Sequence, residues 1–151
     1  MKNKNYAKFL LMEAISFVIM YVVMFLNIDK LDHIYLSTTR LYMALLMVSP
    51  MAWVMLLFMS KMYENKKMNI VVIIASISIF VISFTFLRTQ TPISDVQYMK
   101  AMIPHHSSAI LTSQEANIKD PEVKKLAEQI IKTQKEEIAL MKKLIKKIEE
   151  E

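Results

Sequence analysis

The stretch IVVIIASISIFVISFTFL, residues 70–87, decides the fold of this chain. It is uncharged and apolar, and a helix of about 20 such residues crosses the hydrocarbon core of a bilayer. Two earlier blocks, residues 9–26 and 41–59, have the same character, and Glu13 is the only charged residue within the three blocks. The sequence therefore predicts three transmembrane helices at about residues 9–26, 41–59 and 70–87.

The net charge of +5 is confined to the part of the chain that holds these blocks. Residues 1–90 contain nine Lys or Arg against four acids, whereas residues 91–151 contain ten of each. A balanced C-terminal part gives no basic surface for nucleic acid. Lysines precede the first block and follow the second, so the positive-inside rule places the N-terminus in the cytoplasm and the C-terminal domain outside.

Two residue types are absent from the sequence, and their absence excludes several classes of site. There is no cysteine, which excludes thiolate metal sites and thiol catalysis. There is also no glycine, which excludes glycine-rich phosphate loops and dinucleotide-binding fingerprints.

Residues 91–151 have the pattern of two helices joined by a short turn. Ser94 and Gln97 form a capping box that starts the first helix at about Asp95, and this helix should continue to near residue 117. Asp120 followed by Pro121 then marks the start of a second helix that continues toward residue 148. We therefore expect an all-α protein with a membrane domain, residues 1–90, and a helical hairpin, residues 91–151.

The first of these two helices carries the motif MKAMIPHHSSAI, residues 99–110. At helical spacing Met99, Met102 and His106 share one stripe, with His105 beside it. Thioether and imidazole donors without thiolate suit Cu(I) or Ag(I) better than hard cations. The alternative is that the methionines are core residues and the histidines lie at a helix interface.

The second helix has an apolar stripe with two polar interruptions. The stripe consists of Val123, Ala127, Ile130, Ile138, Met141, Ile145 and Ile148. Gln134 and Glu137 lie on the same side, and a buried carboxylate needs a partner, for which the His105 and His106 region is the expected candidate. Glu137 would then complete a metal site or orient a ligating histidine; alternatively, it occupies an exposed edge position.

Two further ionisable residues have ordinary explanations. We expect Glu13 to lie close to the cytoplasmic end of the first span, where it can snorkel or pair with Lys61 or Lys66. We expect His33, in the loop between the first two spans, to be solvated. The alternative for His33 is a metal site shared with Asp29 and Asp32.

Several motifs resemble a known family. They are Met99-x-x-Met102-Ile-Pro-His105-His106, Asp120-Pro121-x-Val123 and Gln134-x-x-Glu137-Ile-x-x-Met141, together with the upstream Leu31-Asp32-His33 and Thr39-Arg40-Leu41-Tyr42-Met43. The chain resembles the membrane-anchored branch of the bacterial family called domain of unknown function 305. The resemblance implies a ferritin-like helical fold and an extracytoplasmic role in copper handling, with the family pattern matched at Met99, Met102, His105, His106, Gln134, Glu137 and Met141.

These observations together predict a metal-binding protein, not an enzyme, in the cytoplasmic membrane of a bacterium. The hairpin would sequester or hand over copper, as Cu(I), or silver, in metal tolerance. The expected ligand set is Met99, Met102, His105, His106, Glu137 and Met141. Because two helices bury little surface, the hairpin should form a homo-oligomer, for which a four-helix bundle is the simplest form. The alternative is a structural or interaction module that oligomerises without metal; a metalloenzyme would need an open coordination position and a substrate pocket.

Overall fold

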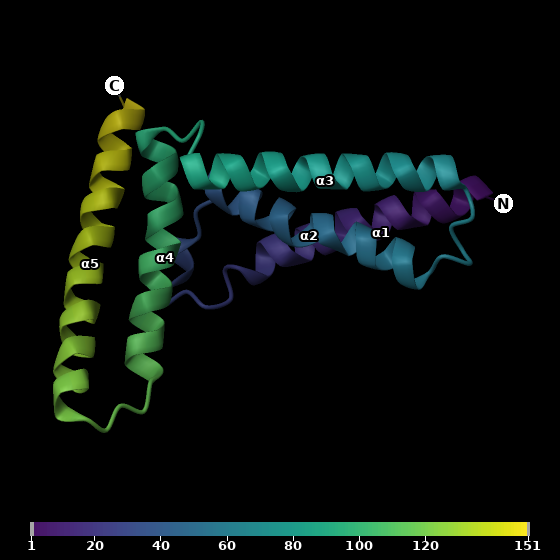
Figure 1. Ribbon diagram of the computed structural model, residues 1–151. Coiled ribbons are helices and arrows are strands. Elements are labelled where there is room, and N and C mark those ends of the chain that lie inside the picture. Colours follow the sequence, from purple (N-terminus) through teal and green to yellow (C-terminus); the bar gives the residue numbers. More distant parts are fainter. Residues whose placement is uncertain (1, 151) are drawn as a thin grey trace. The chain divides into compact units, whose positions relative to one another are not determined.

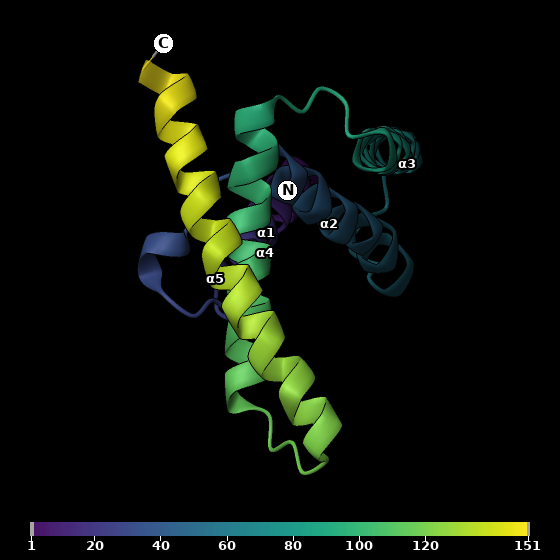
Figure 2. The same cartoon turned by 90° about the vertical axis from the view of Figure 1, so that its left-hand side faces the viewer.

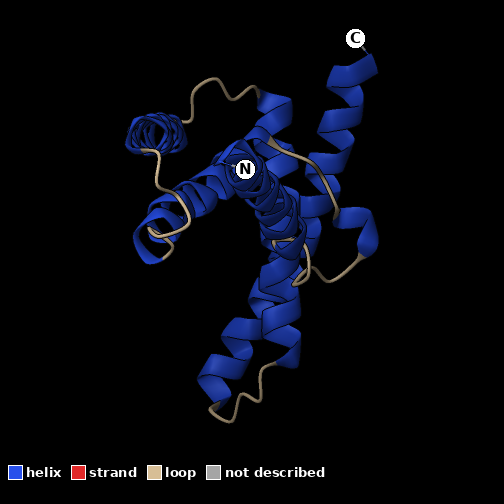
Figure 3. Ribbon diagram, turned by 90° about the vertical axis from the view of Figure 1, so that its right-hand side faces the viewer, coloured by secondary structure: helices blue, strands red, loops and turns tan. Residues whose placement is uncertain are grey.

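The computed structural model describes residues 2–150, with side chains from Asn5 onward, and its regular elements are helices. In chain order they are α1 (Lys2–Val23), the short 3₁₀ helix η1 (Leu31–His33), α2 (Thr38–Phe58), α3 (Lys66–Thr89), α4 (Asp95–Glu115) and α5 (Pro121–Glu150), shown in Figure 1. The described part of the chain contains no strand (Figure 3). The all-α prediction is confirmed.

The chain divides into two compact units, and the division differs from a simple cut at residue 90. One unit combines the residues up to Val23 with Thr39–Pro92 and is called the membrane unit here. The other combines the loop Met24–Thr38 with the residues from Ile93 onward and is called the hairpin unit. The loop between α1 and α2 therefore belongs with the C-terminal helices, although many residues separate them in sequence.

The membrane unit contains three helices long and apolar enough to span a bilayer: Asn5–Val23, Thr38–Phe58 and Lys66–Thr89. The first of these helices begins and ends earlier than the predicted block 9–26: it already includes Asn5–Lys8 and stops at Val23. In an 18-residue apolar stretch of each helix, 33% of α2 is buried, against 11% of α1 and of α3. The central helix is thus the most enclosed, and the large apolar side chains that α1 and α3 expose suit contact with lipid.

An aromatic cluster holds one end of the membrane unit together. Tyr63, in the loop before α3, has its ring centroid 5.4 Å from that of Tyr6 and 5.6 Å from that of Phe9. Ala52 and Leu56 of α2 complete this buried cluster. These tilted and edge-on rings have the arrangement in which aromatic pairs attract beyond simple burial.

Glu13 lies within the first candidate span, eight residues after Asn5. Its Oε1 atom is enclosed and has no hydrogen-bond partner among the described residues. The expected pairing with Lys61 or Lys66 is therefore not formed at this atom, whereas the expected position near the cytoplasmic end of the span stays a prediction.

The hairpin unit has the helix ends that its sequence predicts. Ser94 Oγ accepts a hydrogen bond of 3.3 Å from the backbone N–H of Gln97 at the start of α4. Asp120 Oδ1 accepts from the N–H groups of Glu122, at 2.9 Å, and Val123, at 3.0 Å, at the start of α5. Each cap satisfies backbone donors that the first helical turn leaves free.

Helices α4 and α5 lie side by side (Figures 1 and 2). Their shared core consists of Met99, Ile103, Ile110, Ile138, Met141 and Ile145. The predicted stripe of α5 is buried at four positions, Ala127, Ile138, Met141 and Ile145, whereas its end residues Val123 and Ile148 remain 48% and 42% exposed. The stripe is therefore covered over its centre and open at both ends.

The loop between α1 and α2 packs onto α4. Asn27 Nδ2 donates to Ser108 Oγ at 2.6 Å, and the backbone N–H of Thr38 donates to Gln97 Oε1 at 3.0 Å. Tyr35 lies against the hairpin core. Loop and hairpin thus form one compact unit.

Candidate metal-binding groove

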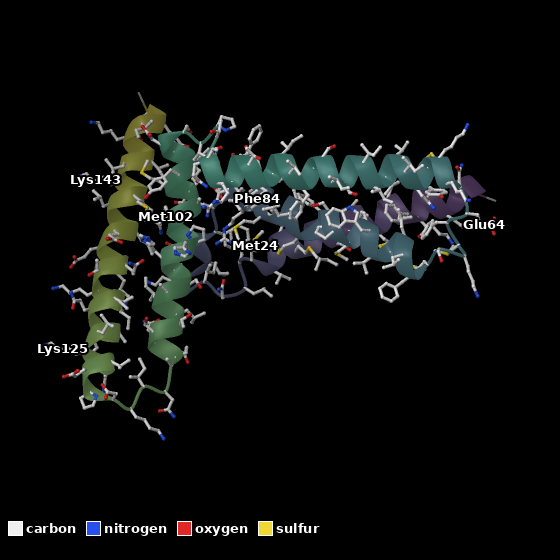
Figure 4. All side chains as sticks on the ribbon, viewed as in Figure 1. Met24, Glu64, Phe84, Met102, Lys125 and Lys143 are labelled. Atoms are coloured by element: carbon white, nitrogen blue, oxygen red, sulfur yellow. The ribbon has the colours of Figure 1, made fainter. Side chains whose placement is uncertain are left out.

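An open groove of about 600 Å³ runs between α4 and α5. It is lined by Asp95, Tyr98, Met99, Met102, His106, Glu137, Leu140, Met141, Leu144 and Ile148. Met102 lies between the two helices (Figure 4), whereas Lys125 and Lys143 are exposed on α5. The helical spacing of the motif on α4 and the antiparallel pairing with α5 thus bring three thioethers, one imidazole and two carboxylates to one groove.

His106 is the most enclosed polar side chain of the groove, with its side chain 13% exposed. Its Nδ1 atom lies 3.2 Å from Glu137 Oε2, as the pairing of the two helices predicted. The two groups form an ion pair only if the ring is protonated, and Nδ1 has no hydrogen-bond partner among the described residues. An enclosed nitrogen of this kind calls for an explanation, and a bound ion is one of the usual ones.

The surroundings of His106 favour the neutral form of its ring. Burial lowers the pKa of His106 below its ordinary value, the neighbouring His105 lowers it further, and the negative charge of Glu137 opposes both effects. A neutral imidazole has the lone pair that a metal ligand needs. Gln134 Nε2 donates to Glu137 Oε2 at 3.4 Å, which helps to hold the carboxylate beside the ring.

The donors of the groove are thioether, imidazole and carboxylate groups. Within residues 2–150, no group of three or more His, Asp or Glu side chains is placed so that it could hold a metal ion. Thioether and imidazole groups are the donor types that suit Cu(I) and Ag(I).

The structure brings together five of the six predicted ligands and leaves one outside. Met99, Met102, His106, Glu137 and Met141 line the groove. His105 is exposed, and its ring centroid lies 6.1 Å from that of His106. A residue that sequence analysis missed is Asp95, which lines the groove one helical turn before Met99 and could have been found from the spacing alone.

Comparison with known proteins identifies the family. Residues 85–151 match the family model described as domain of unknown function (DUF305). An uncharacterized protein of Acanthamoeba polyphaga mimivirus is 36% identical over 144 residues, which cover 93% of this chain and 93% of that protein. The chain belongs to the DUF305 family. No solved structure matches it.

The two similarities differ in how much of the chain they cover. The DUF305 match begins inside α3 and includes the whole hairpin, with all six predicted ligands. The similarity to the viral protein extends through the membrane helices as well, because it covers nearly the full length of both chains. The viral protein is therefore similar to this chain both in the three apolar helices and in the DUF305 hairpin.

His33 of this DUF305 protein is not solvated, contrary to expectation. It is 6% exposed, and its Nδ1 atom lies 2.8 Å from Ser107 Oγ of α4, which also accepts a 2.8 Å hydrogen bond from the N–H of Asp29. Asp32 lies 3.8 Å from His33 Nε2 through Oδ1 and pairs with Lys142 at 2.6 Å through Oδ2. The alternative of a metal site with Asp29 and Asp32 is not supported, because no group of three such side chains that could hold a metal ion is found among the described residues. His33 instead fastens the loop to the hairpin.

Acid is expected to loosen this attachment. Burial is the largest cause that lowers the pKa of His33 in the folded protein, followed by the charge of Lys142, while Asp32 and Asp29 act in the opposite direction. The unfolded loop therefore binds the proton more readily, so the docked state has its full stability above pH 6.5 and loses it as pH falls toward the lowered pKa. Amide hydrogen exchange of residues 24–38 should accelerate over this range, after correction for the intrinsic pH dependence of exchange. A His33→Asn variant should remove the effect; an unchanged pH response in that variant would contradict the role of His33.

Proposed function

We propose that this DUF305 protein is a membrane-anchored binding protein for Cu(I), with Ag(I) as an alternative ion, and not an enzyme. The ion is cargo that the protein sequesters or hands over, in a role in metal tolerance. The observation that supports this proposal best is the position of His106, which lines the same groove as three methionine side chains. Its enclosed Nδ1 atom lies 3.2 Å from Glu137 Oε2 and makes no hydrogen bond among the described residues. An ion that accepts soft donors would satisfy that nitrogen.

Five of the lining residues have a part in the proposal. Met99, Met102 and Met141 supply thioethers, and the ring of His106 supplies nitrogen. Glu137 lies close enough to His106 to offset the charge of the ion or to orient the ring. His105 is exposed and lies outside this groove, so the proposal gives it no part in binding.

The placement of the groove outside the cytoplasm is also part of the proposal. Lysines flank α1 at its N-terminal side and the loop between α2 and α3, which favours a cytoplasmic location for both. The loop Met24–Thr38 and the hairpin would then lie on the exterior side. The cytoplasmic membrane of a bacterium fits the family resemblance.

A second candidate function follows from the apolar surface that the hairpin exposes. Tyr98, Leu126 and Leu140 are each more than half exposed. Burial of this surface against a second hairpin would complete a ferritin-like four-helix bundle. The hairpin could therefore serve as an oligomerisation module, with or without metal.

The experiment that tests metal binding compares the two adjacent histidines. Full-length protein in lipid nanodiscs is titrated with Cu(I) in the presence of a competing chromophoric chelator, and Ag(I) is tested in the same way. His106→Ala should weaken Cu(I) binding by at least about 10- to 100-fold, because it removes a ligand and the loss of a supporting residue alone costs this much. His105→Ala is the matched control and should change affinity little.

Two results would contradict the proposal. One is wild-type protein that fails to compete with the chelator for Cu(I). The other is an equal loss of affinity in both histidine variants, which would show that His106 contributes no more to Cu(I) binding than the exposed His105 does. Native mass spectrometry of the same samples tests the second function: an oligomer that forms independently of metal, without Cu(I) binding, would favour the interaction module.

A further inference from the structure

The membrane unit contains a cavity of about 350 Å³ that is separate from the groove of the hairpin. Its walls come from all three apolar helices: Phe9 and Glu13 of α1, Val48 and Ser49 of α2, and Val72 and Ser76 of α3 are among them. The volume lies in the range of about 300–1,000 Å³ that is usual for small-molecule sites. Hydrocarbon side chains make up most of its lining.

Glu13 is the exception in this lining. Its Oε1 atom is enclosed and lacks a hydrogen-bond partner within the described part of the chain. The other ionisable group in the lining is the phenol of Tyr6, which donates a 2.7 Å hydrogen bond to Asn69 Oδ1. Among the residues whose side chains the structure describes, no lysine or arginine lines the cavity. An enclosed carboxylate is costly unless a cation accompanies it.

The cavity is poorly suited to a small metal ion. Hard cations take six or more oxygen ligands, including waters. The two serine hydroxyls in the lining donate to backbone carbonyls instead: Ser49 to Leu45 at 2.8 Å and Ser76 to Ile73 at 3.0 Å. One carboxylate within apolar walls therefore matches a cation that carries its own apolar surface.

We propose that this cavity binds a lipophilic organic cation, such as a quaternary ammonium or phosphonium compound. The positive centre pairs with the carboxylate of Glu13, and the apolar substituents fill the space between α1, α2 and α3. Burial of apolar surface provides the affinity, and the carboxylate provides the selectivity for positive charge.

The test compares a cation with a neutral molecule of similar shape. Radiolabelled tetraphenylphosphonium and triphenylphosphine oxide are dialysed against full-length protein in nanodiscs, with empty nanodiscs as the background. The wild-type protein should bind the cation saturably, and Glu13→Gln should weaken this binding at least about tenfold, since it removes one partner of an enclosed charge pair. The neutral compound should bind the two proteins equally, which also shows that the variant retains its cavity.

Two further variants make the test specific. Glu13→Asp keeps the carboxylate and should keep most of the cation binding. Glu64→Gln removes an equal charge from the loop between α2 and α3 (Figure 4) and should have no effect.

A fluorescence measurement locates the bound molecule. Trp53 is the only tryptophan in the sequence, and its Nε1 donates to Ser76 Oγ, at the cavity wall, at 2.6 Å. The emission of Trp53 should therefore change as the cation binds. The proposal is overturned if Glu13→Gln binds the cation as tightly as wild type, or if the neutral compound binds wild type as well as the cation does; the latter result would indicate a cavity for lipid acyl chains.

Discussion

Replacement of both Met102 and Met141 by leucine is expected to weaken Cu(I) binding on the order of 100-fold or more. A change that affects only a residue supporting a metal ligand already lowers metal affinity by about 10- to 100-fold. The two side chains line the groove from opposite helices. Leucine fills a similar volume, so the variant should fold with a loss below about 1.5 kcal/mol. The measurement is the same chelator competition, with full-length protein in nanodiscs.

The control for this variant has the same chemical change elsewhere. Met43 and Met47 of α2 are 42% and 41% exposed and lie in the membrane unit. Their replacement by leucine should leave Cu(I) affinity unchanged. If the two double variants bind Cu(I) equally well, the thioethers of the groove are not ligands.

Truncation of Ile103 to alanine is expected to have the largest effect on stability. Ile103 is fully enclosed in the core shared by α4 and α5. Removal of such a side chain leaves a cavity and costs about 2–5 kcal/mol. The opening free energy of α5, measured by amide hydrogen exchange in the full-length protein, should fall by this amount.

A surface leucine provides the comparison. Leu140 of α5 is 56% exposed, and Leu140→Ala should change the opening free energy by no more than about 0.5 kcal/mol. Similar losses in the two variants would show that the hairpin is not held together by the cluster around Ile103.

The helices of this protein could be predicted because their determinants are local. Apolar length predicts the three membrane helices, and Ser94 and Asp120 mark the starts of α4 and α5 through hydrogen bonds to residues two or three positions ahead. The ligand stripe of α4 follows from helical spacing for the same reason. Antiparallel pairing then predicted the proximity of His106 and Glu137.

Two features of the structure depend on distant parts of the chain, which neither composition nor spacing specifies. His33 lies beside Ser107, which is 74 positions away in sequence, and Glu13 lines a cavity whose walls come from three separate helices. The error on His105 is of another kind. His105 is exposed because neighbouring residues on a helix are about 100° apart, so it lies outside the groove that His106 lines.

Residues 24–38, which connect α1 to α2, also cover part of α4 through hydrogen bonds. A hairpin released from its anchor at residue 91 would expose the hydroxyls of Ser107 and Ser108 and the amide of Gln97, which the intact protein covers with this segment. Fusion of the hairpin to a foreign membrane helix would have the same effect. The segment of residues 24–38 and the hairpin are thus matched parts of one unit, and neither can be exchanged without the other.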